Sequence, residues 1–502
     1  MRQNKIKFLL LIFLTVVLIY IFCNYFLKDS ISVILPDNLV YNDSLITGMY
    51  VDNVLCSYDS KSNIYFSNID DVDGISFYSK YNNLKYVISG SSHNLYSVFV
   101  YNDVYYYNLN LVISDVPIVN IYDLDIFKYG ENNEPNILFD VNSTDDDYIS
   151  DRKKIGISIS NILQNNGKIS FSSFGYMTER GASSSFFYKK SYKLELNDDF
   201  GILNVKDDNI WVLDALYTDS SKIRNKLSSD MWNLINNNQN IDNDLNCVFV
   251  EVFINNEYVG LYALKEKVDK SVTKNTDSGL LLKATMQLWD DRIVKFLSNP
   301  NVIYNNMVLN FEIKDFNDMT YNNFVRNMYS FYSGVRNYDA VSDVYYIDNY
   351  LNYKLFVAFI NGGDNATSNQ YYSMIDANSK ILITPWDMDL TWGLYWNLDT
   401  SLHSEFSMES SYNADLIDGN ITKNMDEKTL GLMRKRYWEL RKNVITMDTI
   451  NGYLDSYKDI LVNSGAAKRD SERWYEYDVE FEIEQIREWA QRRIEFLDEY
   501  FK

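Results

Sequence analysis

The chain has 502 residues, more than one typical hydrophobic core organises, so two or three domains are expected. Apolar residues make up 46%, which excludes global disorder, and the five prolines exclude Pro-rich linkers and collagen-like repeats. The formal net charge is −22, and the first 28 residues carry four bases and no acid, which leaves −26 for the remainder. This charge argues against nucleic acid as a partner and favours basic partners or divalent cations, although a surface that only keeps the protein soluble explains it equally well.

Cysteine and histidine are too scarce to support most metal or triad chemistry. Cys56 and Cys247 could pair in an oxidising compartment, but two separate buried thiols are the simpler interpretation. His93 and His403 lie far apart in the sequence, which argues against a His-centred triad or a multi-His zinc site. Catalysis would therefore depend on carboxylates, Lys and Arg.

An apolar run over residues 8–27 is long enough to cross a bilayer, and three basic residues precede it. We expect residues 1–29 to form an uncleaved transmembrane anchor. A cleaved signal peptide is the alternative, but its apolar core would be shorter, and no small-x-small cleavage site follows. Because basic flanks stay in the cytoplasm, everything after Lys28 should be membrane-anchored and extracytoplasmic.

Residues 30–115 alternate short runs rich in Val, Ile, Tyr and Phe with turn clusters, as in 63–67 and 98–107. Strands at this spacing predict a β-sandwich-like module. The segment contains no recognisable chemistry, which is typical of a spacer or binding module.

A second strand-rich block extends over residues 116–267. At its centre a Gly- and Ser-containing loop, residues 178–188, precedes a basic strand. Backbone amides of such a loop, together with Arg180 and a strand lysine such as Lys190 or Lys193, could cradle phosphates. The alternative is a polar turn before a strand whose lysines face water.

Helical and strand patterns then alternate along the chain. Residues 220–235 carry apolar positions at helical spacing behind a Ser N-cap, and 248–266 reads as two strands joined by an Asn-Asn turn. The apolar stripe over 347–359 predicts a core-facing helix. Later helices are expected over 429–442 and 478–501.

Four polar residues follow the helix predicted over 347–359. Asp364 and Asn369 lie five positions apart, and Asp387 and Asp389 come directly after a predicted hairpin, residues 370–384. Protein kinases use an Asp for the acceptor hydroxyl, an Asn five residues later for Mg²⁺, and a later Asp for Mg²⁺ on the phosphates. The oxygen ligands suit a hard divalent cation, with room for water and phosphate. Asp and Asn after a helix are also common in caps and turns, so the spacing alone is only moderately specific.

Six short motifs occur in a fixed order along the middle of the chain. They are Arg180-Gly181, Lys189-Lys190-Ser-Tyr-Lys193, Asp219-x-Ser-x-x-Arg224-Asn225 after Trp211-Val-Leu, Asn255-x-x-Tyr-x-Gly260-x-Tyr-x-Leu-x-Glu266, Asp364-Asn365 and Pro385-Trp-Asp-x-Asp389. Together they resemble the spore coat protein H (CotH) kinase family, whose members are protein-kinase-like enzymes. The resemblance covers roughly residues 116–393. It implies an α+β fold with a kinase-like domain over 116–502, made of a strand-rich lobe (116–267) and a helical lobe (268–502) that hold ATP between them.

The resemblance also implies roles for the residues that would bind the nucleotide. Arg180 and one of Lys190 or Lys193 would contact the phosphates of ATP, and Glu266 would lie near the segment that joins the lobes. The helix after the basic strand offers Arg224 and Asp230, and no Glu, where kinases provide a Glu partner for the phosphate-binding lysine. The assignment of that lysine therefore stays open.

The same resemblance implies a metal and an acceptor site. Asp364 would orient or deprotonate the acceptor hydroxyl, while Asn369 and Asp387 would hold Mg²⁺ or Mn²⁺ and Asp389 would support them. All four positions are intact, which favours an active enzyme over a pseudokinase.

The expected function is phosphoryl transfer from ATP to Ser or Thr of surface or spore-coat proteins. A non-catalytic coat-assembly or surface-binding protein on the same fold is one alternative, and a metal-dependent phosphohydrolase is another. Since ATP is scarce outside a cell, an extracytoplasmic kinase would need a special compartment such as a developing spore envelope. The acidic charge predicts basic Ser- or Thr-containing segments as acceptors.

Overall fold

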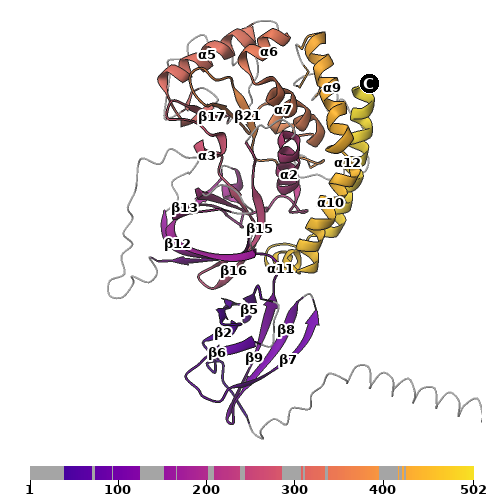
Figure 1. The fold of residues 1–502 in the computed structure, drawn as a ribbon. Coiled ribbons are helices and arrows are strands. Elements are labelled where there is room, and N and C mark those ends of the chain that lie inside the picture. Colours follow the sequence, from indigo (N-terminus) through magenta and orange to yellow (C-terminus); the bar gives the residue numbers. More distant parts are fainter. Residues whose placement is uncertain are drawn as a thin grey trace, which may run out of the picture. The chain divides into compact units, whose positions relative to one another are not determined.

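The computed structural model has a mixed α+β fold (Figure 1). It describes residues 39–69, 74–92, 94–124, 152–164, 167–181, 183–201, 208–237, 243–284, 307–308, 311–333, 337–394, 417, 421–422 and 425–502. The expected membrane anchor, residues 1–29, lies outside the described residues. Within the described residues, no helix is long and apolar enough to cross a membrane.

The chain divides into two compact units. One comprises Met1–Cys56 with Asp71–Leu111, and the other comprises Ser57–Asp70 with Val112–Lys502. Residues 57–70, which the sequence analysis included in the module 30–115, thus group by their contacts with the larger unit. Their strands are β4 (Ser57–Asp59) and β5 (Ile64–Ser67).

The smaller unit is built from short strands. They are β1 (Val40–Tyr41), β2 (Gly48–Val51), β3 (Val54–Leu55), β6 (Ile75–Tyr78), β7 (Lys85–Ser92), β8 (Leu95–Tyr101) and β9 (Tyr105–Ile113). One sheet has the order β3-β2-β6, and in another β8 lies between β7 and β9. Asp52 and Asn53 join β2 to β3 with φ of 48° and 65°, the left-handed conformation that tight hairpin turns require. Their short polar side chains tolerate that conformation, which explains the turn.

Seven strands of the larger unit close into a barrel. They are β10 (Ile118–Asp123), β11 (Lys153–Gln164), β12 (Gly167–Arg180), β13 (Ser191–Phe200), β14 (Asp208–Asp214), β15 (Cys247–Ile254) and β16 (Glu257–Glu266), in the order β10-β11-β12-β13-β14-β16-β15. A parallel pairing of β10 with β15 completes the closure. The predicted Asn-Asn turn is confirmed, because Asn255 and Asn256 join β15 to β16 with φ of 52° and 58°.

A five-stranded sheet and most of the helices follow the barrel. The sheet has the order β18-β19-β17-β20-β21, made of β17 (Leu280–Ala284), β18 (Met307–Val308), β19 (Phe311–Asp315), β20 (Gln370–Met374) and β21 (Leu382–Pro385). The α-helices are α2 (Arg224–Asn237), α3 (Lys270–Thr273), α5 (Asp318–Ser333), α6 (Tyr338–Val344), α7 (Ile347–Ile360), α9 (Glu427–Asn443), α10 (Met447–Lys458), α11 (Ala466–Arg473) and α12 (Val479–Tyr500). The helices predicted over 220–235, 429–442 and 478–501 correspond to α2, α9 and α12.

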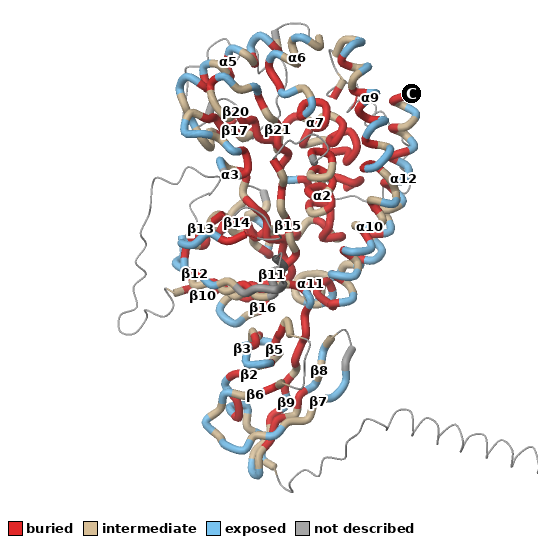
Figure 2. Tube along the Cα trace, in the orientation of Figure 1, coloured by how far each residue is buried: buried red, intermediate tan, exposed pale blue. Residues whose placement is uncertain are grey.

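Helix α7 is the centre of this part of the molecule. The sequence predicted one apolar stripe, but the structure buries nearly the whole helix (Figure 2). The buried residues include Asn349 and Asn352. Helices α2, α9 and α12 and strand β21 pack around it. Asn349 donates to the carbonyl oxygen of Ile383 and accepts from its amide, which fixes β21 against the helix. The chain that leaves α7 therefore starts from a rigid base.

Strand register decides which charged residues face the helices. Lys193 on β13 and Lys265 on β16 both pair with Val212 on β14, and paired residues share a face of the sheet. Val212 belongs to the core shared with the helices, whereas its neighbour Leu213 points into the barrel. Lys193, Lys265 and, two residues beyond Val212, Asp214 therefore lie on the outer face of the barrel, toward the helical part.

Candidate active site

The loop after α7 carries Asp364 and is tied to the loop that carries Asp387. Asp364 begins a short 3₁₀ turn, η4 (Asp364–Ala366). The buried side-chain amide of Asn365 donates to the carbonyl oxygens of Asn369 (3.1 Å) and Trp386 (2.8 Å). Since one side chain bridges both loops, the two aspartates are brought to the same place, as the sequence predicted.

Asp387 adopts a left-handed backbone conformation just after β21. It is exposed and has a φ of 54°, while Met388 beside it is buried. A left-handed conformation at a residue other than Gly costs energy and is concentrated at functional sites. The amide of Met388 donates to the side-chain oxygen of Asn225 on α2 (3.4 Å). The turn is thus held by Asn365 on one side and Asn225 on the other, while Asp387 is exposed.

Asn369 adjoins these aspartates through its backbone. It has a φ of 49°, and its carbonyl oxygen accepts from the amide of Trp386 (2.9 Å) as well as from Asn365. The sequence analysis expected its side chain to hold metal, and that role stays a prediction.

Burial and the charge of Asp387 raise the pKa of two neighbouring carboxylates, Asp364 and Asp389. Burial, followed by the charge of Asp387, raises the pKa of Asp364. Burial, followed by Asp387 and Asp214, raises the pKa of Asp389 to about 8, with Lys265 acting in the opposite direction. Thr218 donates a hydrogen bond to Asp389 (3.3 Å). A bound divalent cation would reduce the repulsion between these neighbouring carboxylates.

The carboxylates of this site fit a divalent cation whose remaining ligands come from phosphate and water. Among the described residues, no three His, Cys, Asp or Glu side chains are grouped closely enough to enclose a metal ion. Mg²⁺ is usually bound in kinases by one or two carboxylates, with phosphate oxygens and water completing its shell. Asp387, exposed beside Asp364 and Asp389, meets that description.

Two cations lie against the ring of Trp386, the residue directly before Asp387. The Nζ of Lys265 lies 4.7 Å from the ring centroid, and the Cζ of Arg180 lies 5.7 Å from it. Lys265 is buried and pairs with Asp214 (2.6 Å). Burial lowers the pKa of Lys265, but Asp214 and Asp387 outweigh it and raise that pKa. Lys265 therefore stays charged next to the aspartates.

Asp214 is the acidic partner that the sequence analysis could not find. Burial raises its pKa, but Lys265, the amide of Leu216 and Arg180 hold the pKa below its usual range. Asn225 donates to Asp214 (3.0 Å) and accepts from Met388, so it links the ion pair to the Asp387 loop. In the sequence, Lys265 is adjacent to Glu266 on a predicted strand, and side chains alternate between the two faces of a strand. This alternation is the sequence signal that could have placed Lys265 on the face opposite Glu266.

The two lysines favoured from sequence have local partners. Lys190 donates to the carbonyl oxygen of Ser185 in η3 (Ser183–Phe186), and Lys193 pairs with Glu195 (2.6 Å). Gly181, with a φ of 113°, starts this loop, and a Cβ there would meet the Ser184 hydroxyl oxygen at 1.9 Å. The phosphate contacts of Lys190 and Lys193 stay predictions, and Lys265 joins them as a third candidate.

Glu266 lies at the end of β16, where the chain leaves the barrel for α3. Its carboxylate accepts from the side-chain amide of Asn246 (2.6 Å), and burial raises the pKa of Glu266 to about 7. It faces away from Lys265, since successive residues of a strand point to opposite faces. The structure brings together Arg180, Asp364, Asp387 and Asp389, and no contact links Glu266 to that group among the described residues.

Comparison with known proteins assigns the family. No curated protein matches the chain. Residues 178–497 match the family model described as CotH kinase protein. This match covers more than half of the chain, includes both aspartate loops and the Arg180 and Lys265 strands, and confirms the resemblance found from the motifs. The chain belongs to the CotH kinase family.

Proposed function

We propose that this protein is a metal-dependent kinase that transfers the γ-phosphoryl group of ATP to Ser or Thr hydroxyls of proteins. The observation that carries the proposal is that Arg180 and Lys265 lie against Trp386, directly before Asp387, and that the charge of Asp387 acts on Lys265, Asp364 and Asp389. Cations from the barrel and carboxylates from the helical part are what phosphoryl transfer requires on its two sides. The barrel and the helical part would act as the two lobes.

The cations would bind the phosphates. Arg180 and Lys265 lie against Trp386, and Asp214 keeps Lys265 protonated and in place. A guanidinium and an ammonium together offer several donors to phosphate oxygens. Lys190 or Lys193 would add a further contact if the loop after Arg180 closes on the nucleotide.

Asp387 and Asn369 would hold Mg²⁺ or Mn²⁺, supported by Asp389. When bound, the ion supplies positive charge against the phosphates and the developing charge of transfer. The protein contributes a turn that is held rigidly by Asn225 and Asn365. An exposed carboxylate on a fixed backbone suits a ligand that arrives with the nucleotide.

Asp364 would receive the proton of the acceptor. The hydroxyl oxygen forms the new bond to the γ-phosphorus, the bond to the departing ADP breaks, and the hydroxyl proton passes to the Asp364 carboxylate. The raised pKa of Asp364 makes it a stronger base than an ordinary aspartate. Asn365 bridges the loops that carry Asp364 and Asp387, so an acceptor hydroxyl at Asp364 would lie close to phosphates at Asp387.

ATP labelled on the γ-phosphate tests the proposal. We expect label on protein hydroxyls, dependent on Mg²⁺ or Mn²⁺. Release of all the label as inorganic phosphate would instead identify a phosphohydrolase, and unchanged ATP with every protein acceptor would identify a non-catalytic binding protein.

We further propose basic Ser- or Thr-containing segments as acceptors, and a membrane-anchored, extracytoplasmic site of action such as a spore envelope. The charge of −26 beyond residue 28 supports the first, because long-range attraction concentrates cationic peptides. The apolar run over 8–27 supports the second. Fractionation of the full chain, with sequencing of its N-terminus, tests the anchor; a mature N-terminus after residue 20 would contradict it.

A further inference from the structure

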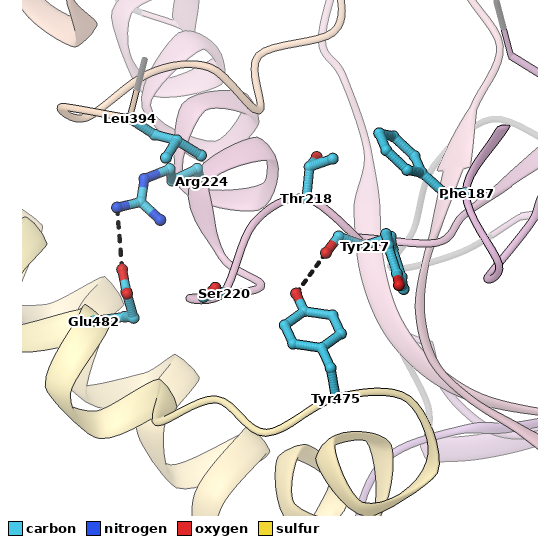
Figure 3. A pocket seen from close by; sticks show the side chains of 8 residues that line it. All are labelled: Phe187, Tyr217, Thr218, Ser220, Arg224, Leu394, Tyr475 and Glu482. Atoms are coloured by element: carbon cyan, nitrogen blue, oxygen red, sulfur yellow. Dashed lines mark hydrogen bonds and ion pairs between the residues drawn. The ribbon is translucent and has the colours of Figure 1, made fainter. Parts of the chain in front are cut away.

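A cavity of about 270 Å³ lies beside the aspartate loop (Figure 3). Its walls come from four segments that are distant in sequence: the η3 loop, the β14–α2 connection, the end of the aspartate loop and the C-terminal helices. The lining residues are Phe187, Tyr217, Thr218, Ser220, Arg224, Leu394, Tyr475 and Glu482. None of them is proposed to contact ATP, the metal or the acceptor hydroxyl, although Thr218 also donates a hydrogen bond to Asp389.

Three aromatic rings form one end of the cavity. The ring centroids of Phe187 and Tyr217 are 5.3 Å apart, and those of Tyr217 and Tyr475 are 5.2 Å apart in an edge-to-face arrangement. The Tyr475 hydroxyl donates to the carbonyl oxygen of Tyr217 (2.5 Å), which fixes the C-terminal segment against the β14–α2 connection. Aromatic faces carry partial negative charge, so they attract cations as well as apolar groups.

The charged end of the cavity has one carboxylate that is weakly compensated. The guanidinium of Arg224 lies 2.5 Å from Asp219, so that buried pair largely neutralises itself. Glu482 is 3.5 Å from the same guanidinium, at the limit of a hydrogen bond, and Arg224 is the one charged partner that it has among the described residues. Burial raises the pKa of Glu482 although Arg224 lowers it. A second cation would stabilise this carboxylate.

The nearby cation Lys222 lies behind the aromatic wall of the cavity. Lys222 lies against the Tyr475 ring, 4.9 Å from its centroid, but it is fully buried and does not line the cavity. Its Nζ donates to the carbonyl oxygen of Leu216 (2.9 Å) and to the Tyr475 hydroxyl (3.2 Å), and it pairs with Asp470 (3.8 Å). An anionic ligand would thus find no free cation on the cavity wall, since Arg224 is already held by Asp219.

We infer that this cavity binds a small organic cation, an ammonium group on an apolar body, with the ammonium at Glu482 and the body among the rings of Phe187, Tyr217 and Tyr475. The site is adjacent to the catalytic centre through Thr218, which lines the cavity and donates to Asp389. It is separate from the proposed transfer of phosphate, because binding requires neither ATP nor a metal.

Calorimetric titration of the full chain, without nucleotide or metal, tests the inference. The probes are phenethylammonium, its neutral counterpart 2-phenylethanol, and the anion 3-phenylpropionate. We expect the cation to bind about tenfold more tightly than the alcohol, the scale of a desolvated cation–π and charge contact, and the anion to bind least. Equal affinity for cation and alcohol, or tightest binding of the anion, would overturn the assignment.

Two variants locate the binding. Glu482→Gln keeps the shape of the side chain and should remove the preference for the cation, whereas Glu488→Gln on the same helix, where the side chain is 73% exposed, should keep it. Leu394→Trp fills the cavity and should abolish binding of both cation and alcohol, and thermal unfolding shows that each variant is folded. A preference that survives Glu482→Gln and Leu394→Trp would place the cation elsewhere and refute the inference. Because ATP is absent from every titration, this result is independent of whether the protein is a kinase.

Discussion

Replacing Lys265 by Met separates the structural from the functional contribution of its ion pair. Lys265 and Asp214 are 7% and 19% exposed and 2.6 Å apart. Losing one partner of a buried pair leaves the other charge uncompensated and costs about 3–5 kcal/mol of unfolding free energy. Since Asp214 still accepts from Asn225 and the Leu216 amide, we expect the lower end, about 3 kcal/mol.

The double variant Lys265→Met/Asp214→Asn supplies the decisive comparison. It leaves no unpaired charge, so urea unfolding should recover most of the lost stability, with an interaction energy of at least about 1 kcal/mol between the two sites. Phosphoryl transfer should nevertheless remain at least about a hundredfold reduced in both variants, because a positioned cation on the phosphates is missing.

Lys193→Met provides the matched control. Lys193 lies on the same row of the sheet but pairs with Glu195, which is more exposed than Asp214 and also pairs with Arg152, so the loss of Lys193 should cost less unfolding free energy than the loss of Lys265. We expect a larger loss of transfer for Lys265→Met than for Lys193→Met. The reverse order, or a double variant no more stable than Lys265→Met alone, would refute the assignment of Lys265.

Three further predictions follow from the site and its surroundings. Asp364→Asn should reduce the transfer rate at least about a hundredfold without loss of fold, as measured by steady-state kinetics and thermal unfolding, and a rate near wild type would exclude it as the base. Burial raises the pKa of Glu266 from 4.5 to about 7, so the stability that Glu266 contributes is complete below about pH 4.5 and is lost as the pH rises to about 7. Glu266→Gln should therefore raise the free energy of unfolding at pH 8 by up to about 3 kcal/mol and flatten the pH dependence of urea unfolding between pH 5 and 8. An unchanged pH profile would contradict this prediction. A peptide array should show stronger labelling of Ser in basic contexts at low salt than at high salt, whereas equal labelling in acidic and basic contexts would leave charge steering unsupported.

Features that depend on local sequence were predictable. The Asn255–Asn256 hairpin follows from two residues that tolerate the left-handed conformation, and the meeting of Asp364 with Asp387 follows from a short hairpin that returns the chain to its start. Membership of the CotH kinase family followed from six ordered motifs and is confirmed by the family match.

Features that depend on pairing between distant strands were not predictable. Strands β14 and β16 are neighbours in the barrel although α2 and β15 lie between them in sequence. Their register alone sets Lys265 opposite Val212 and beside Asp214, and no local pattern encodes it. The role of Asn225 was hidden for the same reason: the sequence placed it in a helix motif, whereas its link between Asp214 and Met388 depends on contacts between distant segments. The burial of nearly all of α7 likewise depends on distant helices such as α12, whose Arg493 donates to the carbonyl oxygen of Ala358 across 135 residues, and an apolar stripe on one face does not predict it.

The central claim is that Asp387 and its neighbours support transfer of phosphate from ATP to a protein hydroxyl. Its most direct test measures label on protein after incubation with γ-labelled ATP and Mn²⁺ or Mg²⁺, for the wild type, Asp387→Asn and the control Asp339→Asn, whose side chain is 81% exposed on α6. Asp387 is also exposed, so its replacement should leave thermal unfolding nearly unchanged. The account predicts labelled Ser or Thr with the wild type and Asp339→Asn, and none with a folded Asp387→Asn; labelling by Asp387→Asn at the wild-type rate would contradict it.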